Sequence, residues 1–273
     1  MIYQTVDDVS FRMKKRSDFS FLHKYGKVFK VFDDQDSGNI CFGVSDGKRK
    51  LFIKFAGAMT AEYDGAPEDA VQRLRSVVPL YREIQSDYLI RLLGTDEICG
   101  GFAMIFEWAE GKCMARMYPE EHRSIMALPV DRKMAVFSDV TRFLHDVNQQ
   151  GYIAIDFYDG SIMYDEQTGK TTICDIDFFR KKPCVNDMGR MWGSERFLSP
   201  EEYTRGAVLD EVTNVFTLGK TGFALFADSD EDAGTFPLDR HFYEVLKKAV
   251  SVDRNERYAS IKEFAYSWDN TIL

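Results

Sequence analysis

The sequence predicts an α+β protein, with an N-terminal antiparallel sheet that carries one helix and a larger, mainly helical C-terminal part. Residues 27–58 alternate apolar and polar side chains between turns rich in Gly, Asn and Asp, which is typical of antiparallel hairpins. Residues 129–150 have apolar side chains at helical spacing, and most of the chain beyond residue 200 is typical of helices. The character changes near residues 109–112, so we expect one domain over residues 1–109 and a second over residues 110–273.

Composition excludes several classes of protein. The chain has 273 residues, of which 45% are hydrophobic and 29% charged, which is enough to bury a substantial core. The net charge is −9, whereas nucleic-acid-binding proteins are more often basic, so we expect no nucleic-acid partner. The apolar runs are shorter than the ~20 residues of a membrane span, and the N-terminus lacks the apolar segment of a secretory signal. We therefore expect a cytoplasmic monomer or weak dimer without a membrane partner.

The N-terminal domain should contain five strands. The pattern of residues 27–58 predicts a meander of three strands. A helix follows in "DGAPEDAVQRLRSVVPLYREI", where Pro67 suits the first helical turn and Pro79 should kink or end the helix. "YLIRLLGTDEICGGFAMIFEW" then predicts two more strands around a Gly-Gly turn.

The C-terminal domain should begin with a helix in "PVDRKMAVFSDVTRFLHDVNQQ" that stops near Gly151. "GYIAIDFYDGSIMYDEQTGKTTICDIDFF" predicts two short strands joined at "DEQTGK". The stretches "SPEEYTRG", "TNVFTLGKTGFALF" and "HFYEVLKKAVSVDRNERYASIKEFAYSWDN" predict mostly helices.

Three charged residues accompany apolar segments. Lys54 lies inside the third strand, and a lysine in a buried strand usually meets an anion; the alternative is an edge strand with a lysine that points to water. Asp156 and Asp177 follow apolar runs, where a strand ends. Carboxylates in such positions can hold a hard divalent cation or accept a proton, and the alternative is solvated turn residues.

The order and spacing of these residues resemble the eukaryotic-type serine/threonine protein kinases of bacteria. The resemblance covers about residues 19–268 and implies a two-lobed fold that transfers the γ-phosphoryl group of ATP, with Mg²⁺, to Ser or Thr hydroxyls of a protein substrate. Lys54, in "FIKFAGA", would hold the phosphates. Asp156, in "AIDFYDGS", would be the catalytic base, facing a cleft between the lobes. Asp177, in "DFF", would bind the metal together with Ser161.

The resemblance also assigns further nucleotide contacts. The hairpin "FDDQDSGNICFG" matches the glycine-rich loop, and "MIFEWAEG" matches the hinge between the lobes. The remaining residues that would contact the nucleotide are Ser37, Gly38 and Asn39 in the loop, and the backbone of Glu107 and Ala109 at the hinge.

Motifs beyond residue 190 resemble those of protein kinases. "FLSPEE" is similar to the A-P-E motif, with Glu201 as its acid, and "DRNERY" places Arg257 where the family has the arginine that pairs with it. This ion pair would be structural. "TNVFTLG" is similar to D-x-W-S-L-G, with Asn214 in place of the aspartate. Small-molecule kinases usually lack the A-P-E helix and the later arginine, so these motifs favour a protein kinase.

The chain departs from the family in the catalytic loop. Ala154 and Ile155 replace the His and Arg of H-R-D, and Tyr158 replaces the loop lysine. Phe179 replaces the glycine of D-F-G. Because the arginine that usually reads a phosphorylated activation loop is missing, we expect any activity to be independent of loop phosphorylation.

The nucleotide loop and the following helix also depart from the family. Asp33 and its neighbours would repel a triphosphate unless they point away or share a cation. The helix has no acid at the position that should pair with Lys54, and Glu68 and Glu83 are candidates only in another register. A pseudokinase that binds nucleotide or a partner, and a kinase for a small alcohol or amine, therefore remain as alternatives.

Overall fold

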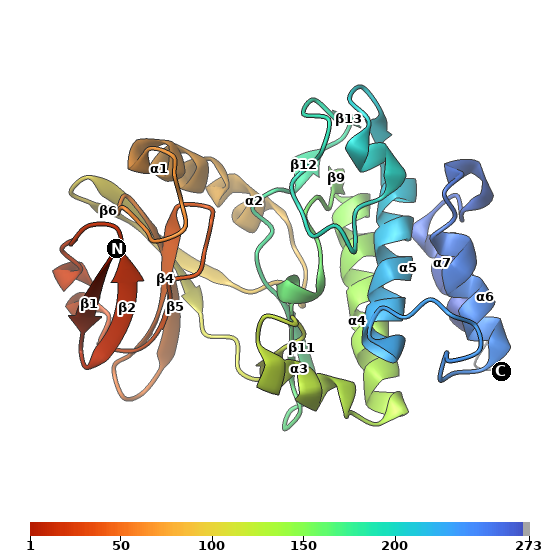
Figure 1. Ribbon diagram of the computed structural model, residues 1–273, viewed down its shortest axis with the longest axis horizontal. Helices are drawn as coiled ribbons and strands as arrows, with labels where there is room; N and C mark the ends of the chain where they lie inside the picture. Colours follow the sequence, from red (N-terminus) through yellow and green to blue (C-terminus); the bar gives the residue numbers. More distant parts are fainter. Residues whose placement is uncertain (270–273) are drawn as a thin grey trace. The chain divides into compact units, whose positions relative to one another are not determined.

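The computed structural model describes residues 1–269 and has the predicted α+β class (Figure 1). The chain forms two compact units. The first comprises Met1–Glu83 and Ile90–Ala109, and the second comprises Ile84–Leu89 and the chain from Glu110 onward. The short segment 84–89 thus belongs to the second unit, although it precedes two strands of the first. The last residue of this segment, Leu89, forms an isolated bridge with Ile173, which ties the segment to the second unit.

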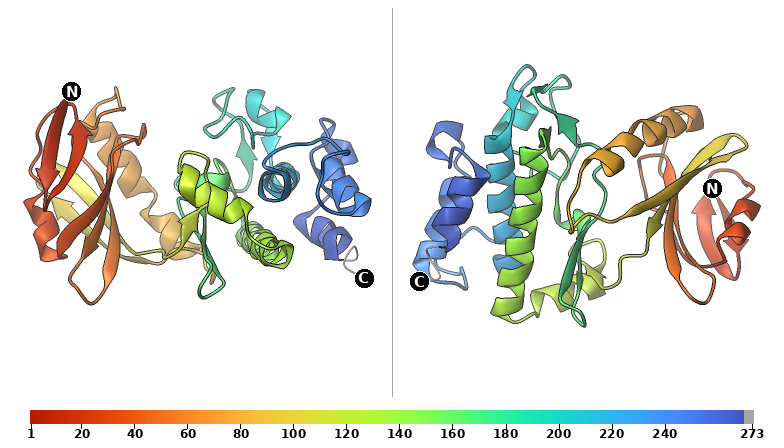
Figure 2. Two further views of the ribbon diagram at one scale, coloured as in Figure 1. Left: turned by 60° about the horizontal axis from the view of Figure 1, so that its bottom comes forward. Right: turned by 180° about the vertical axis from the view of Figure 1, so that it is seen from behind.

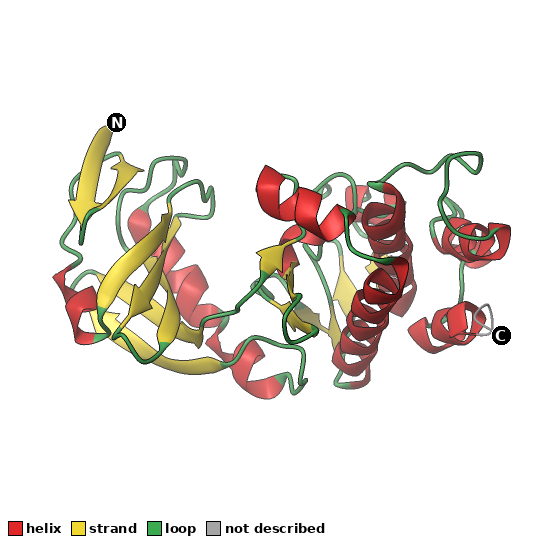
Figure 3. Cartoon of the chain, turned by 90° about the horizontal axis from the view of Figure 1, so that it is seen from below, coloured by secondary structure: helices red, strands yellow, loops and turns green. Residues whose placement is uncertain are grey.

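The first unit contains the predicted five-stranded antiparallel sheet, whose strands are among those drawn in yellow in Figure 3. All three hairpins that the sequence predicts are present: β3 pairs with β4, β4 with β5, and β6 with β7. The order in the sheet is β3-β4-β5-β7-β6. The strands are β3 (Lys27–Phe32), β4 (Asn39–Ser45), β5 (Lys50–Ala56), β6 (Leu92–Ile98) and β7 (Gly101–Glu107).

An N-terminal hairpin, which the sequence analysis does not include among the strands, covers part of this sheet. It consists of β1 (Ile2–Val6) and β2 (Val9–Met13), followed by the short helix η1 (Ser20–Lys24). Phe11 packs against Phe19 and Phe42 with ring centroids 5.7 and 6.0 Å away. The hairpin therefore belongs to the hydrophobic core of the first unit.

The predicted helix of the first unit is broken in two, as Pro79 requires. Helix α1 spans Pro67–Ser76 and α2 spans Val78–Glu83. Pro79 has no N–H to donate to the preceding turn, so the α1 hydrogen bonds cannot continue through it. Helix α1 packs on β5 and β7 through the buried side chains of Ala70, Val71 and Leu74.

The second unit is mainly helical. Helix α4 packs beside α5, and α6 and α7 pack on them (Figures 1 and 2). Aromatic rings fill this core; Phe137 of α4, for example, lies 4.6 Å from Trp268 of α7. The helices are α3 (Pro119–Met126), α4 (Val130–Gln149), α5 (Glu211–Ala227), α6 (Arg240–Ala249) and α7 (Ile261–Asp269). Within residues 1–269, no helix has both the length and the apolar character that crossing a bilayer would need.

Short strands complete the second unit. β10 (Ile162–Asp165) and β11 (Lys170–Ile173) form the hairpin predicted around "DEQTGK", and β8 (Lys112–Cys113) extends it. β9 (Tyr152–Ile153) pairs with β12 (Arg180–Lys181), and β13 (Cys184–Val185) pairs with β14 (Val208–Leu209). The 3-10 turns are η2 (Asp159–Ser161), η3 (Pro200–Tyr203) and η4 (Arg254–Glu256).

The helix predicted in "SPEEYTRG" is wrong. The chain makes only the turn η3, because Thr204 is already extended with φ −113° and ψ 108° and leads into β14.

Candidate functional site

The loop that follows β9 is fixed by a side chain from α5. Asn214 Oδ1 accepts a hydrogen bond from the Ala154 N–H at 3.0 Å, and Asn214 Nδ2 donates to the Ala154 carbonyl at 2.7 Å. Both residues are buried. An asparagine side chain offers an acceptor and donors together, whereas an ionised aspartate only accepts. The asparagine thus matches both polar groups of residue 154, which an ionised aspartate in its place would not do.

Asp156, the predicted base, sits in an unusual backbone conformation. Its φ is +57°, in the left-handed region that aspartate tolerates better than most residues. Gly193 packs directly on it: a Cβ atom at residue 193 would lie 3.3 Å from Asp156 Oδ1 and 3.5 Å from Asp156 Cα. The position of the carboxylate therefore depends on a glycine about forty residues further along the chain.

Ser161, the predicted second metal ligand, lies close to the segment that leads to Asp177. The Ser161 carbonyl accepts a hydrogen bond from the Cys174 N–H at 2.8 Å, and Asp177 follows three residues later. The structure thus brings Ser161 to the end of β11, where the chain continues to the partly buried Asp177.

Two oxygen atoms in this loop are buried without a protein partner. Ser161 is fully buried and its Oγ has none. Asp159 is 1% exposed; its Oδ2 accepts a hydrogen bond from Arg196 at 2.5 Å, but its Oδ1 has no partner. Leaving such a group unsatisfied costs about 1–3 kcal/mol, so each of these atoms has the capacity to bind an ordered water or an ion.

The donor types around Ser161 suit a hard cation. Carboxylate and hydroxyl oxygens are ligands that Mg²⁺ accepts, and Mg²⁺ commonly retains waters and binds through only one or two carboxylates together with substrate phosphates. Among residues 1–269 no three His, Cys, Asp or Glu side chains are grouped to hold a metal by themselves. The residues present therefore fit a site shared with a phosphate, not a closed protein cage.

Tyr158 is a largely buried residue of the same loop. Its ring lies over Gly160, where a Cβ atom would come within 2.3 Å of the ring. Burial raises the pKa of the Tyr158 hydroxyl well above its ordinary value, and the charges of Asp175 and Asp156 raise it further. The phenol is consequently neutral. Arg196 supplies a positive charge to this loop through its ion pair with Asp159.

Asp175 does not lie on a strand beside Asp177. β11 ends at Ile173, and Asp175 is exposed with φ +56°. The left-handed conformation breaks the two-residue alternation of an extended strand, so Asp175 and Asp177 do not share a strand face.

In the first unit, Lys54 lies on a central strand. β5 is the third of five strands, and Lys54 pairs with Cys41 on one side and Met104 on the other. The residue is 7% exposed. The edge-strand alternative for Lys54 is therefore wrong. The face of α1 that packs on the sheet is apolar, and Glu68 is exposed in its first turn.

Asp33 does not place an uncompensated charge in the predicted nucleotide loop. Its Oδ2 accepts from the Arg12 backbone N–H at 2.6 Å and from Arg12 Nε at 3.2 Å. Arg12 belongs to β2, so the N-terminal hairpin supplies the neutralising cation. Asp34 and Asp36 are exposed.

The rest of that loop is docked on α1 and the segment before it. Gly38 has φ +83°, and a Cβ atom there would lie 2.7 Å from the ring of Tyr63. Arg73 of α1 donates to the Ser37 carbonyl at 2.9 Å. Asn39 begins β4 and is 6% exposed, and its Oδ1 has no partner. Ser37, Gly38 and Asn39 are thus fixed within the first unit.

Glu107 and Ala109, the predicted adenine contacts, lie at and just beyond the end of β7. The Glu107 N–H donates to the Arg91 carbonyl at 3.1 Å, so it is not available to a ligand. The Glu107 side chain also pairs with the Arg91 guanidinium. Ala109 follows in an irregular, partly buried stretch.

Apolar contacts hold the segment after β12 against the loop that contains Ile155. Ile155 belongs to a buried cluster with Ile153, Cys184, Met191 and Leu209. These residues join β9, β13 and β14 through hydrophobic contact, which requires no phosphate.

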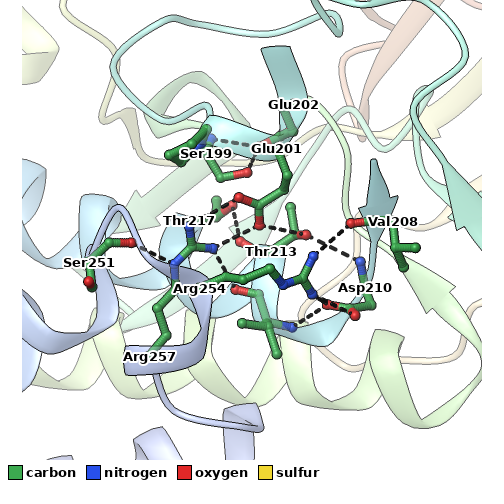
Figure 4. Close-up of polar contacts among 12 residues, drawn as sticks. Ser199, Glu201, Glu202, Val208, Asp210, Thr213, Thr217, Ser251, Arg254 and Arg257 are labelled. Atoms are coloured by element: carbon green, nitrogen blue, oxygen red, sulfur yellow. Dashed lines mark hydrogen bonds and ion pairs between the residues drawn. The ribbon is translucent and has the colours of Figure 1, made fainter. Parts of the chain in front are cut away.

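The predicted Glu201–Arg257 ion pair is present and bidentate (Figure 4). Arg257 Nη1 lies 2.7 Å from Glu201 Oε1, and Nη2 lies 3.0 Å from Oε2. Thr213 Oγ1 also donates to Glu201 Oε1 at 3.0 Å. Burial opposes ionisation of Glu201, but the Arg257 contact outweighs it and lowers the pKa of the carboxyl. The pair joins η3 to the segment before α7.

Glu202 is a buried acid that the sequence analysis missed. Its Oε2 accepts from the Ser199 N–H at 2.8 Å and from Ser199 Oγ at 2.9 Å (Figure 4). Burial raises the pKa of Glu202 to about 7. The residue lines a narrow crevice with Asp156 and Thr217 that has no room for a water molecule. The S-x-x-E pattern of a capping box in "SPEE" was the signal that could have identified it.

Comparison with known protein families and with curated protein sequences gives no match for this chain.

Proposed function

We propose that this chain is a serine/threonine protein kinase with the two-lobed protein-kinase fold, which transfers the γ-phosphoryl group of ATP to a protein hydroxyl. The observation that carries the proposal is the loop of residues 154–161. It is fixed by buried hydrogen bonds from Asn214, contains the predicted base, and leaves oxygen atoms of Asp159 and Ser161 buried without protein partners. The Glu201–Arg257 pair supports it independently.

Each residue of the second unit has a defined role in this proposal. Asp156 orients the acceptor hydroxyl and takes its proton. Asp177 and Ser161, with Asp159 nearby, hold Mg²⁺, which when bound neutralises charge on the transferred phosphoryl group. Arg196 holds Asp159 through its ion pair, so that the loop keeps its shape when the substrates bind.

The first unit binds the nucleotide in this proposal. Lys54 provides a cation for the phosphates, and its place on a central strand fixes the backbone from which its side chain extends. The loop contacts are made by Ser37, Gly38 and Asn39, and the adenine contacts by the backbone of Glu107 and Ala109.

The proposal is tested by measuring Mg²⁺-dependent ATP binding by calorimetry and transfer from radiolabelled ATP to general protein substrates. Asp156→Asn should retain binding and lose transfer on the order of a thousandfold, because general-base catalysis is removed. Asp177→Asn should lose the dependence of binding on Mg²⁺. Asp165→Asn, at the β10–β11 turn, is the matched control and should behave as wild type. Absence of transfer by wild-type protein with any divalent metal would contradict the proposal.

A pseudokinase is the second candidate, and the loop before β4 favours it. Arg73 and Tyr63 hold Ser37 and Gly38 against α1, so the loop is fastened within its own unit. ATP-dependent thermal stabilisation without transfer would support this candidate. Transfer stimulated by small alcohols or amines but not by proteins would instead indicate a small-molecule kinase.

A further inference from the structure

Exposed apolar side chains are concentrated in one segment of the second unit. Five of the fourteen large hydrophobic side chains that are exposed among residues 1–269 lie within a stretch of 24 residues. We call this surface the 185–208 face. It consists of Val185, Met188, Trp192, Tyr203 and Val208. Single exposed apolar residues are ordinary, but a concentration of this kind marks an interaction surface.

The 185–208 face is ordered before any partner binds. Val185 of β13 pairs directly with Val208 of β14, near the label β13 in Figure 1. Asn186 is fully buried between them and the turn η3; its N–H donates to the Ala207 carbonyl at 2.9 Å, and its Nδ2 donates to the Glu202 carbonyl at 3.0 Å. A surface that is already rigid loses little conformational entropy on binding.

The same segment is basic although the protein is acidic. Residues 180–208 contain six Lys and Arg, and their exposed carboxylates are only Asp187 and Glu195, since Glu201 and Glu202 are buried. Arg180 pairs with Asp187 at 2.9 Å and Arg190 pairs with Glu195 at 3.5 Å, so each exposed carboxylate has a partner within the segment, and the exposed Arg205 adds further positive charge. The whole chain has a net charge of −9, so this segment has a charge opposite to that of the molecule. Such a patch favours an acidic partner.

The face ends at the predicted catalytic base. Trp192 is 52% exposed and directly precedes Gly193, which packs on Asp156. Phe178 supports Trp192 from below, with ring centroids 5.9 Å apart. A polypeptide that covers Trp192 would consequently have residues close to the carboxylate of Asp156.

We propose that the 185–208 face docks an acidic polypeptide segment that carries apolar side chains, and that this segment presents the Ser or Thr acceptor. The second part rests on the proposed kinase function. The exposed aliphatic side chains of Val185, Met188 and Val208 favour a polypeptide over single-stranded nucleic acid, whose bases bind mainly by stacking on aromatic rings.

Binding to a degenerate peptide library with a fixed central serine tests the docking without requiring catalysis. The full-length protein is immobilised, and the captured peptides are sequenced. Peptides enriched in Asp or Glu together with Leu, Ile or Phe are expected. Arg190→Glu/Arg205→Glu should reverse the charge preference and weaken an acidic fluorescent peptide about tenfold in anisotropy titrations. Trp192→Ala should weaken the same peptide by a similar factor, about tenfold, because Trp is the usual anchor of an interface.

Matched controls lie elsewhere on the surface. Arg49→Glu alters a 70% exposed side chain, and Tyr266→Ala alters a 72% exposed ring; both should bind the acidic peptide as wild type does. Three outcomes would each overturn the docking proposal. The protein could capture peptides independently of their charge, it could prefer basic peptides, or a single-stranded oligonucleotide could bind more strongly and displace the peptide.

The two proposals fail separately. Capture of acidic peptides by a protein that transfers no phosphate would refute the kinase function and leave the docking surface intact. The opposite result is that the protein captures and phosphorylates peptides equally well whatever their charge. That result would refute the docking surface and leave the kinase function intact.

Discussion

Replacing Glu202 with glutamine should change how stability depends on pH. Glu202 is 3% exposed, and burial raises the pKa of its carboxyl to about 7 from an ordinary value of 4.5. The folded protein therefore binds this proton more tightly than the unfolded chain does. Its contribution to stability is fully present below pH 4.5 and is lost as the pH rises through 7, because the buried group must then ionise.

The size of the effect follows from the difference between the two pKa values. Each pKa unit corresponds to about 1.4 kcal/mol, so the folded state loses about 3 kcal/mol in total as Glu202 ionises. Glutamine stays neutral at every pH and can still accept the hydrogen bond from the Ser199 N–H. Relative to wild type, Glu202→Gln should thus gain about 2–3 kcal/mol of stability between pH 5 and pH 8.5.

Urea unfolding followed by tryptophan fluorescence measures this difference at several pH values. The quantity of interest is the free energy of unfolding of the variant minus that of wild type, in which other titrating groups cancel. Glu195→Gln is the matched control: the side chain is 77% exposed on the same segment, so its difference from wild type should be independent of pH. The reasoning is refuted if the Glu202→Gln difference is also constant with pH, or if it falls as the pH rises.

Three further predictions concern residues 184–209 and the Glu201–Arg257 pair within the same unit. Arg257→Ala should lower the free energy of unfolding in urea by about 3–5 kcal/mol, because it leaves the buried Glu201 carboxylate without its partner. Replacing both residues with methionine should cost clearly less, and equal costs would argue against a buried pair. Gly193→Ala and Gly189→Ala both put alanine at a positive φ, +136° and +99°, but only the methyl at 193 would press on Asp156. Transfer should therefore fall about tenfold or more in Gly193→Ala relative to Gly189→Ala, and equal rates would show that the contact is unimportant. Complete dephosphorylation, checked by mass spectrometry, should leave the transfer rate unchanged, since hydrophobic contacts hold this segment; loss of transfer that a phosphomimetic restores would contradict this.

Local patterns in the sequence predict the elements whose causes are local. The hairpins between residues 27 and 58 follow from alternation and turn residues, and the break between α1 and α2 follows from the missing N–H of Pro79. The Glu201–Arg257 pair also follows from motifs in the sequence, although its members are 56 residues apart.

Other features depend on contacts that a local pattern does not contain. Alternation in β2 gives a core strand only because Phe11 meets Phe19 and Phe42. "SPEEYTRG" has helical composition, yet pairing of β14 with β13 extends the chain after Tyr203.

The sequence by itself determined the hairpins of residues 27–58, the break at Pro79 and the long helix that ends near Gly151, and it identified which acids and cations are candidates for chemistry. Only the tertiary structure decided that Lys54 lies on a central strand, that Arg12 neutralises Asp33, and that Glu202 is buried. The physical reason is that secondary structure depends largely on neighbouring residues, whereas desolvation and hydrogen-bond partners depend on segments that are distant in sequence. Asn214 and Ala154, for example, are separated by sixty residues and meet only in the folded chain.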